Sequence, residues 1–367
     1  MSAGNYYIGI MSGTSLDAID VVIAQRTEQG LQQVAGIAPA MPETLRQQLL
    51  TICADKKVDL QTLGEVDHLF ALTCADVVNQ LLKKSNINAS QITAIGSHGQ
   101  TIFHSPLTAM PFTQQIGDSN LIAAKTNIPC ISDFRRMDMA YGGQGAPLVP
   151  AFHQALFATP TEQRIILNIG GIANVSILGK DKSVLGYDTG PGNMLMDAWI
   201  DKCLGEPYDK GGCFAQQGKV NNTLLDKLLA DEYFSLSAPK STGREKFNLA
   251  WLEQQLDNKH LNNADVQRTL LEFSAVSIAD QIKLHSEKAA IFVCGGGALN
   301  PLLMQRLQQL LKNHTVSDTN LLNVDPMFVE AIAFAWLAEQ RLLEKPIPLK
   351  SVTGATRDAI LGCVYLP

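Results

Sequence analysis

Short apolar runs alternate along the chain with longer segments in which apolar residues recur every three or four positions. The short runs are rich in Ile and Val, which is typical of buried strands, whereas the longer segments have the period of helices. This alternation predicts an α/β protein rather than a β-sandwich or a helix bundle. The expected strands are the apolar runs at 7–11, 18–24, 92–96, 164–169, 174–178, 184–187 and 290–294.

Three helices have recognisable starts in the sequence. The pair Asn300-Pro301 is an N-cap followed by proline at the first helical position, and the pair Asp325-Pro326 repeats this opening. Asn193 is expected to cap a third helix, which Gly205 ends. These signals separate the helices from the strands that precede them.

The beginning of the chain is echoed near its middle. The strand at 7–11, Gly13 and the strand at 18–24 correspond to the strand at 164–169, Gly171 and the strand at 174–178. Gly13 and Gly171 are 158 residues apart, which is about one domain length. The echo predicts a duplicated domain with a cleft between the two copies, and such clefts commonly hold ligands.

Composition excludes several classes of protein. The chain has 29 Lys and Arg against 35 Asp and Glu, a net charge of −6, and 17% of its residues are charged while 46% are hydrophobic. This content of apolar residues excludes a disordered protein. The lack of clustered positive charge argues against a nucleic-acid partner, because binding to phosphates requires it.

Nothing in the sequence directs the chain to a membrane or out of the cell. No apolar stretch approaches the ~20 residues of a membrane-spanning helix, and no basic region precedes the first apolar run. The seven cysteines are odd in number and none has C-x-x-C spacing, so free thiols are expected rather than zinc ligands or disulfides. We therefore expect no membrane partner and a cytoplasmic location.

The turn after the first strand is a candidate phosphate site. It combines a glycine, two hydroxyls and two carboxylates in the segment Gly13, Thr14, Ser15, Leu16, Asp17, Ala18, Ile19 and Asp20. Backbone N–H groups and hydroxyls hold phosphate oxygens, and Asp17 or Asp20 would organise Mg²⁺. The same residue types also make an ordinary hairpin turn. The echo at Gly170 and Gly171 favours the functional interpretation.

A carboxylate and a second glycine-rich loop are candidate sites in the other half. Asp188 follows the strand at 184–187 and lies beside Gly190 and Gly192, so it could approach a substrate and act as a general base, although it could also simply cap the turn. The loop of Gly295, Gly296 and Gly297 precedes a helix start, which would admit a flat or phosphate-bearing ligand. It is not a Walker A loop, and a tight strand-to-helix turn would explain it equally well.

Three further side chains are candidates for substrate recognition. Arg136, with its neighbour Arg135, suits a carboxylate or phosphate, although a surface ion pair with a nearby aspartate is the competing interpretation. His98 follows the strand at 92–96 and would position a ligand or serve a structural role. Glu330 lies at the border of a very apolar helix, where a solvated glutamate needs no function.

Taken together, the motifs resemble anhydro-N-acetylmuramic acid kinase over essentially the whole chain. The motifs that carry the resemblance are IGIMSGTSLDAID, SHGQT, DFRRMDMAYGGQGAPLVP, LNIGGIANV, DTGPGN, CGGGALN, DPMFVEAIAFAWLA and SVTGATRDAILG. The resemblance implies two ribonuclease-H-like domains around a nucleotide cleft, the fold of actin-like ATPases and sugar kinases. We expect one domain at 1–136 plus about 346–367 and the other at 137–345, with a hinge near the glycines at 142–145.

The resemblance also implies a reaction. The family opens the ring of 1,6-anhydro-N-acetylmuramic acid with water and phosphorylates O6 from ATP with Mg²⁺, in the recycling of cell-wall sugars. Asp188 matches the family's catalytic aspartate, and the segment from Gly13 to Asp20 matches its ATP-phosphate segment. The remaining ATP positions are expected at Gly170, Gly171, Gly295, Gly296, Gly297 and Asn300. The sugar positions are expected at Arg136, Glu330, His98 and Asn193, and the family implies a homodimer.

One residue departs from the family pattern, and three other functions stay open. Ala18 stands where the family usually has glycine, and we expect extended backbone there, which alanine tolerates. The alternatives are a kinase of the same superfamily with another substrate, an ATPase that uses nucleotide to switch conformation, and a paralogue that has lost catalysis. The DTGPGN motif and Asp188 argue against the first and third.

Overall fold

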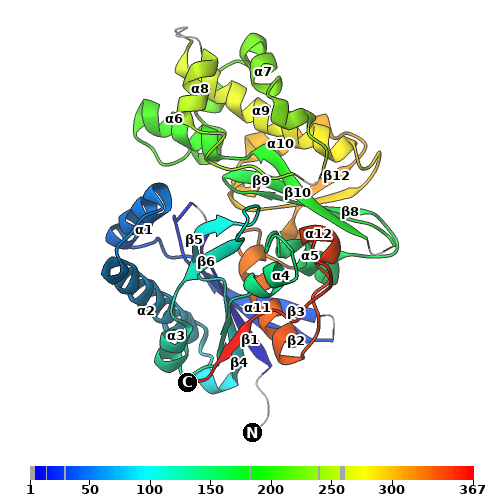
Figure 1. Cartoon of the computed structure of the whole chain (residues 1–367). Helices are drawn as coiled ribbons and strands as arrows, with labels where there is room; N and C mark the ends of the chain where they lie inside the picture. The colour runs from blue at the N-terminus through cyan, green and yellow to red at the C-terminus, as the bar shows by residue number, and fades with distance from the viewer. Residues whose placement is uncertain (1–4, 14, 29, 182, 239, 257–260) are drawn as a thin grey trace. The chain divides into compact units, whose positions relative to one another are not determined.

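The computed structural model describes residues 5–13, 15–28, 30–181, 183–238, 240–256 and 261–367. The chain forms two compact units, coloured along the sequence in Figure 1. Unit 1 contains Met1–Leu156 and Asn323–Pro367, and unit 2 contains Phe157–Leu322. Unit 2 is thus inserted, in sequence, between two parts of unit 1.

The centre of unit 1 is a six-stranded sheet with the order β13-β7-β4-β1-β2-β3. Strands β1, β2 and β3 are antiparallel neighbours, β1, β4 and β7 are parallel, and β13 is antiparallel to β7. A separate two-stranded sheet is formed by β5 and β6. The strands are β1 (Tyr6–Met11), β2 (Asp20–Thr27), β3 (Gly30–Ile37), β4 (Ile92–Ser97), β5 (Gln100–Ser105), β6 (Phe112–Ile116), β7 (Cys130–Ser132) and β13 (Cys363–Tyr365).

Helices pack on both faces of this sheet. Ile8 and Ile10 of β1 are buried against α1, α2 and α3, whereas Tyr7, on the other face of β1, packs with Ala335 of α11. This alternation follows from the two-residue period of a strand. The helices of unit 1 are α1 (Glu43–Asp55), α2 (Leu60–Ser85), η1 (Ala89–Gln91), α3 (Ser119–Thr126), α4 (Arg136–Ala140), α5 (Val149–Phe157), α11 (Val329–Leu342) and α12 (Lys350–Thr353).

Two paired glycines let α11 lie directly on the sheet of unit 1. Gly9 of β1 and Gly96 of β4 are neighbours in register. A Cβ atom on Gly9 would collide with the carbonyl oxygen of Ala331, and one on Gly96 would collide with that of Phe334. The backbone of the helix therefore contacts the backbone of the sheet, which only glycine permits at these positions.

Unit 2 contains a five-stranded sheet with the order β10-β9-β8-β11-β12. Strands β8, β9 and β10 are antiparallel neighbours, and β8, β11 and β12 are parallel. Its strands are β8 (Arg164–Ile169), β9 (Ile172–Leu178), β10 (Val184–Pro191), β11 (Ala290–Cys294) and β12 (Thr315–Asp318). Its helices are α6 (Met194–Leu204), η2 (Lys210–Gly212), η3 (Ala215–Gln217), α7 (Asn222–Leu229), η4 (Glu232–Ser235), α8 (Leu249–Leu256), α9 (Asn263–Lys283), η5 (Gly296–Leu299), α10 (Pro301–Leu310) and η6 (Thr319–Leu322).

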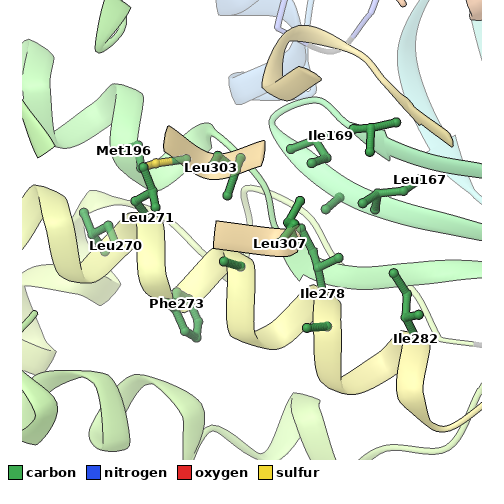
Figure 2. Close-up of a cluster of buried hydrophobic side chains, with 14 of the residues drawn as sticks. Leu167, Ile169, Met196, Leu270, Leu271, Phe273, Ile278, Ile282, Leu303 and Leu307 are labelled. Atoms are coloured by element: carbon green, nitrogen blue, oxygen red, sulfur yellow. The ribbon is translucent and has the colours of Figure 1, made fainter. Parts of the chain in front are cut away.

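The core of unit 2 forms where α6, α9 and α10 meet the sheet. Figure 2 shows Leu271 and Ile278 of α9 among side chains from the other elements of this core. The same cluster contains Leu167 of β8, Met196 of α6 and Leu307 of α10, and all five residues are buried. The long buried helix α9 thus anchors the sheet that carries the glycine loops of unit 2.

The two units repeat one strand arrangement, which confirms the predicted duplication. The five main strands of each unit, numbered in chain order, lie in the order 3-2-1-4-5, with the first three antiparallel and the last two parallel to the first. The β1–β2 and β8–β9 connections, which contain Gly13 and Gly171, occupy the same place in each sheet. This is the expected pair of ribonuclease-H-like α/β domains.

Local expectations about the helices are mostly confirmed. The Asn300 side chain accepts bonds from the N–H groups of Leu302 and Leu303 at the start of α10, and Gly205 ends α6 with a left-handed backbone. α11 begins at Val329 rather than at Pro326, because residues 325–328 form a turn closed by a bond from Phe328 N–H to the carbonyl of Asp325.

The units divide the chain at positions other than those expected. Residues 137–156 and 323–345 belong to unit 1, because α11 covers its sheet and the buried Asp138 ties the first of these segments to Thr353 near the end of the chain. The Asp138 carboxylate accepts bonds from Gly145 N–H and from the Thr353 hydroxyl, both at 2.7 Å. The glycines at 142–145 therefore fold around Asp138 within unit 1 and do not lie where the chain passes between units.

None of the helices in the described ranges is long and apolar enough to cross a membrane.

The contact between α11 and the sheet predicts a large cost for a single methyl group. Gly96→Ala should lower the free energy of unfolding by about 3 kcal/mol, because the added Cβ meets backbone that has no rotamer to change. Gly64→Ala is the matched control, since Gly64 is an exposed residue of α2 with nothing within 4 Å of an added Cβ. It should raise stability by up to about 1 kcal/mol. Urea unfolding followed by circular dichroism measures both, and equal midpoints would contradict this account.

Candidate active site

Three glycine-containing loops of unit 2 lie together at the carboxyl ends of β8 and β11. The turn between β8 and β9 holds Gly170 and Gly171, whose carbonyl groups accept bonds from Asn193 N–H and Gly192 N–H, both at 2.9 Å. An added Cβ on Gly296 would come within 4 Å of the Asn193 side chain. The structure thus brings together Gly170, Gly171 and Gly296, which sequence analysis assigned to ATP.

The glycine loop after β11 has no room for side chains at Gly295 and Gly297. Gly295 has a φ of 78°, and an added Cβ there would lie 2.8 Å from the carbonyl oxygen of Ile169. A Cβ on Gly297 would collide with the Ile169 side chain. The loop therefore follows the end of β8 closely and presents backbone N–H groups ahead of α10, an arrangement that suits a phosphate or a flat ring.

The two asparagines expected at the site bind the protein itself. Asn300 uses its side-chain oxygen to cap α10. Asn193 precedes α6 without a side-chain capping bond, and its amide donates to the carbonyl of Ile169 at 3.2 Å. Both side chains therefore brace the loops.

Asp188 lies within β10, where a bulge follows it. Its backbone N–H donates to the carbonyl of Lys240 at 3.0 Å, and its own carbonyl accepts from the Tyr233 hydroxyl at 2.7 Å. One carboxylate oxygen, Oδ2, accepts from Thr242 N–H at 3.0 Å. Three hydrogen bonds from residues 233–242 thus hold the backbone N–H, the carbonyl and the carboxylate of Asp188.

The surroundings of Asp188 suit a general base near neutral pH. Burial raises its pKa to about 6, the bond from Thr242 N–H acts in the opposite direction, and the charge of Glu245 raises it further. A carboxylate with a raised pKa is a stronger proton acceptor than an exposed one and is still ionised at pH 7.

Sequence analysis did not identify the segment that holds Asp188. Lys240 is buried, its ammonium group donates to the carbonyl of Tyr233 at 3.1 Å, and it lies 4.8 Å from the centre of the Tyr233 ring. Burial lowers the pKa of this lysine. These residues follow Asp188 by about fifty positions with no recognisable spacing, so no signal in the sequence connects them.

In unit 1, the predicted phosphate segment is a tight turn between β1 and β2. Leu16 is buried and has a φ of 58°, a conformation unusual for a branched side chain, and its N–H bonds to the carbonyl of Gly13. Ser15 lies within the same turn, and Thr14 lies outside the described residues. Ala18 pairs with Ala40 in an antiparallel bridge, which confirms the expected extended backbone.

The two aspartates of this segment differ in environment. The Asp17 side chain is 69% exposed and lies 3.6 Å from the Arg46 guanidinium, whereas Ile19 beside it is buried. Asp20 begins β2, and burial together with the nearby charge of Glu330 raises its pKa to about 7. A divalent cation would relieve the repulsion at Asp20, so Asp20 fits Mg²⁺ better than Asp17 does. Among the residues described here, no cluster of three His, Cys, Asp or Glu could hold a metal ion alone.

Arg135 is the buried cation among the candidate residues of unit 1. It precedes α4, its Nη1 donates to the carbonyl of Gly145 at 2.8 Å, and its Nη2 lies 2.9 Å from His98 Nε2. Burial lowers the pKa of Arg135 to about 10, while Glu330 acts in the opposite direction. The charge of Arg135 in turn partly offsets the rise that burial causes in the Glu330 pKa. The structure thus brings Glu330 and His98 to Arg135, which sequence analysis mentioned only as the neighbour of Arg136, and the charge of Glu330 acts on both Arg135 and Asp20.

The contact with Arg135 determines the state of His98. A guanidinium only donates hydrogen bonds, so His98 Nε2 must be the acceptor and the ring is neutral. Burial and the charge of Arg135 agree with this, because they lower the pKa of His98 to about 3. His98 therefore serves to orient groups rather than to carry charge.

Arg136 occupies a different position. Its side chain is 60% exposed and pairs with Asp133 at 2.9 Å. Arg136, Asp133 and the edge of His98 line one cavity of about 380 Å³ between the start of α2 and β6, together with residues that include Gln115, Gly117 and Tyr365. Both interpretations of Arg136 therefore remain compatible with its place, since it is an ion pair at the rim of a cavity.

The carboxylate pair predicts a measurable change in titration. Glu330→Gln should lower the pKa of Asp20 from about 7, because a like charge is removed, but it should leave that pKa above the ordinary range, since burial is the larger cause. Selective ¹³C labelling of aspartate and an NMR titration measure it. Glu65→Gln, an exposed change on α2, is the control that should leave Asp20 unchanged. An unaltered Asp20 pKa in Glu330→Gln would show that the charge of Glu330 does not act on Asp20.

Comparison with known proteins gives one consistent result. Residues 5–367 match the sequence family described as Anhydro-N-acetylmuramic acid kinase. A relative of that name from Vibrio vulnificus (strain YJ016) is 50% identical over 367 residues, which is 100% of this chain and 99% of the relative. One from Pasteurella multocida (strain Pm70) is 52% identical over 364 residues, covering 98% of this chain and 96% of the relative.

The structural comparison also returns distant proteins. The activator of the 2-hydroxyisocaproyl-CoA dehydratase from Clostridium difficile, with bound ADPNP, has a TM-score of 0.48 at 13% identity and covers 96% of this chain and 100% of that chain. The fold assignment therefore rests on the strand order of the two sheets. The sequence match runs through both units, including the glycine loops and Asp188, and shows that the chain belongs to the anhydro-N-acetylmuramic acid kinase family.

Proposed function

We propose that this protein opens 1,6-anhydro-N-acetylmuramic acid with water and phosphorylates O6 from ATP, giving N-acetylmuramic acid 6-phosphate. The observation that carries the proposal is the environment of Asp188, which raises its pKa to about 6. Asp188 is the residue that the family resemblance implies as the catalytic aspartate. A base of this strength takes a proton from water at neutral pH. The product would enter the recycling of cell-wall sugars in the cytoplasm.

The reaction balances with one carboxylate. The oxygen of a water molecule bonds to the anomeric carbon while the bond from that carbon to O6 breaks, and Asp188 accepts one proton from the water. O6 leaves with the electron pair and takes the γ-phosphoryl group of ATP, so ADP is the second product. A glycosidase would need a second carboxylate to protonate the leaving oxygen, whereas here phosphoryl transfer replaces that proton.

Each unit supplies a different part of the proposed chemistry. Backbone N–H groups of the loops at Gly170, Gly171 and Gly295 would hold the nucleotide in unit 2. In unit 1 the turn from Gly13 to Asp20 would hold phosphate oxygens, with the Asp20 carboxylate directed to the Mg²⁺ of Mg²⁺-ATP. Burial of Asp20 supports this role because it keeps the carboxylate poorly hydrated.

Sugar recognition is proposed for the groups around Arg135. Its guanidinium, the neutral ring of His98 and the Glu330 carboxylate form a buried set of donors and acceptors, which suits sugar hydroxyls and the acid group of the substrate. Arg136 at the rim of the adjoining cavity would assist. A homodimer is also proposed, on the family resemblance alone.

The proposal predicts sugar-dependent release of ADP. With Mg²⁺-ATP and the anhydro sugar in ¹⁸O-water, the product should gain one phosphate and one labelled oxygen at the anomeric carbon. Asp188→Asn should lower kcat by about 10²–10⁴-fold and leave ATP affinity within a few fold, since only the base is removed. Mass analysis and calorimetry measure these results. Release of ADP without the sugar would favour an ATPase that switches conformation.

The raised pKa of Asp188 predicts the acid side of the pH profile. The base works only when it is ionised, so kcat/KM should fall about tenfold for each pH unit below about 6. Glu245→Gln should move this fall to lower pH by a fraction of a unit, because the charge of Glu245 raises the pKa of Asp188. Glu287→Gln, an exposed change in the same unit, should leave the profile in place. If the fall in kcat/KM stays at the same pH in Glu245→Gln, the group that titrates is not Asp188.

A further inference from the structure

The Thr242 hydroxyl is a buried polar group beside Asp188. Its Oγ1 atom has no hydrogen-bond partner in the part of the chain that the structure describes. The backbone N–H of the same residue donates to Asp188 Oδ2 at 3.0 Å. One residue thus holds the carboxylate through its backbone and offers an unused hydroxyl next to it.

An unpartnered hydroxyl at this depth has to be explained. Leaving such a group unbonded costs about 1–3 kcal/mol, and valine would fill the same volume without that cost. Water or a ligand is therefore the expected partner of Oγ1. The neighbouring carboxylate has room for the same partner, because Asp188 Oδ1 makes no hydrogen bond to any described residue, while Oδ2 is held by Thr242 N–H.

The geometry allows one water molecule to touch both groups. Oγ1 of a threonine lies about 3 Å from its own backbone nitrogen, which itself lies 3.0 Å from Asp188 Oδ2. A water that donates both of its hydrogens, with O···O distances of about 2.8 Å, bridges acceptors about 4.5 Å apart. Thr242 Oγ1 lies at most about 6 Å from Asp188 Oδ2, so a turn of the Thr242 side chain brings the two acceptors to the separation that a single water bridges.

The segment that carries Thr242 is fixed against β10. Lys240 accepts from Asp188 N–H through its carbonyl and donates through its ammonium group to the carbonyl of Tyr233. Tyr233 closes the loop with its hydroxyl on the Asp188 carbonyl at 2.7 Å. The backbone of Thr242 is thus preorganised relative to the carboxylate, and only the side-chain torsion has to turn the hydroxyl toward it.

We propose that Thr242 Oγ1 is the second acceptor for the water that attacks the sugar. Water has two hydrogens, and a base that holds only one leaves the molecule free to rotate about that bond. With one hydrogen on Asp188 and the other on Thr242, a lone pair of the water oxygen is directed at the anomeric carbon. As that bond forms, the first proton passes to Asp188 and the second stays on the new anomeric hydroxyl, still bonded to Thr242. This inference rests on the proposed function.

The first test compares Thr242→Val with Thr242→Ser. Valine keeps the shape and the backbone N–H but removes the acceptor, so kcat should fall about 10–100-fold while KM for the sugar stays within about twofold. Serine keeps the hydroxyl and should restore kcat to within a few fold. The acid side of the pH profile should not move, because the bond to Asp188 is unchanged. Thr315→Val, on the exposed side of β12, is the matched control.

A second test uses methanol as a competing nucleophile. Methanol has one hydroxyl hydrogen, which it would give to Asp188, so it makes no bond to Thr242. Thr242→Ala should raise the ratio of methyl glycoside 6-phosphate to free sugar 6-phosphate by about fivefold or more, since water alone loses a contact. Thr242→Ser, which also adds room but keeps the acceptor, should leave the ratio near that of the unaltered protein. The ratio does not depend on how much enzyme is active.

The outcomes separate the two proposals. A raised KM with unchanged kcat in Thr242→Val would make the hydroxyl a sugar contact, and unchanged kinetics would remove it from the site; either overturns the inference. An unchanged methanol ratio in Thr242→Ala, or a shifted pH profile in Thr242→Val, would leave only a structural role. If Asp188→Asn keeps full activity or the sugar releases no ADP, the proposed function fails instead.

Discussion

The candidate site residues of unit 1 depend on one constraint, the contact of α11 with the sheet. Gly9 and Gly96 bring the helix backbone onto β1 and β4, and Ala331, whose carbonyl Gly9 approaches, directly follows Glu330. The carboxylate of Glu330 is therefore carried toward Asp20 at the start of β2. A larger side chain at either glycine would lift the helix and separate these charges.

Burial gives the candidate residues of each unit a common character. It raises the pKa values of Asp188 and Asp20 into the neutral range, and it keeps His98 neutral beside Arg135. In each case the protein removes water from a polar group and replaces only some of the hydrogen bonds that water would make. Such groups are ready for a substrate that completes their bonding, which is the electrostatic preparation expected of an enzyme.

The fold could be predicted further than the site. The duplicated hairpins, the cap at Asn300 and the glycines beside Asp188 are local patterns, and periodicity and motif are sufficient to find them. The place of 323–345 in unit 1, the contact of Arg135 with His98 and the hold of Thr242 on Asp188 depend on residues far apart in the sequence. Neither period nor spacing records such contacts, so only the folded chain reveals them.

The insertion of unit 2 within unit 1 has a consequence for synthesis. Unit 2 is continuous from Phe157 to Leu322, so all of its strands are synthesised before α11 and β13. The domain that begins the chain is therefore the last to be completed. Until its final segment arrives, the glycine-lined face of its sheet has no helix to cover it, and the growing protein exposes that apolar surface to its surroundings.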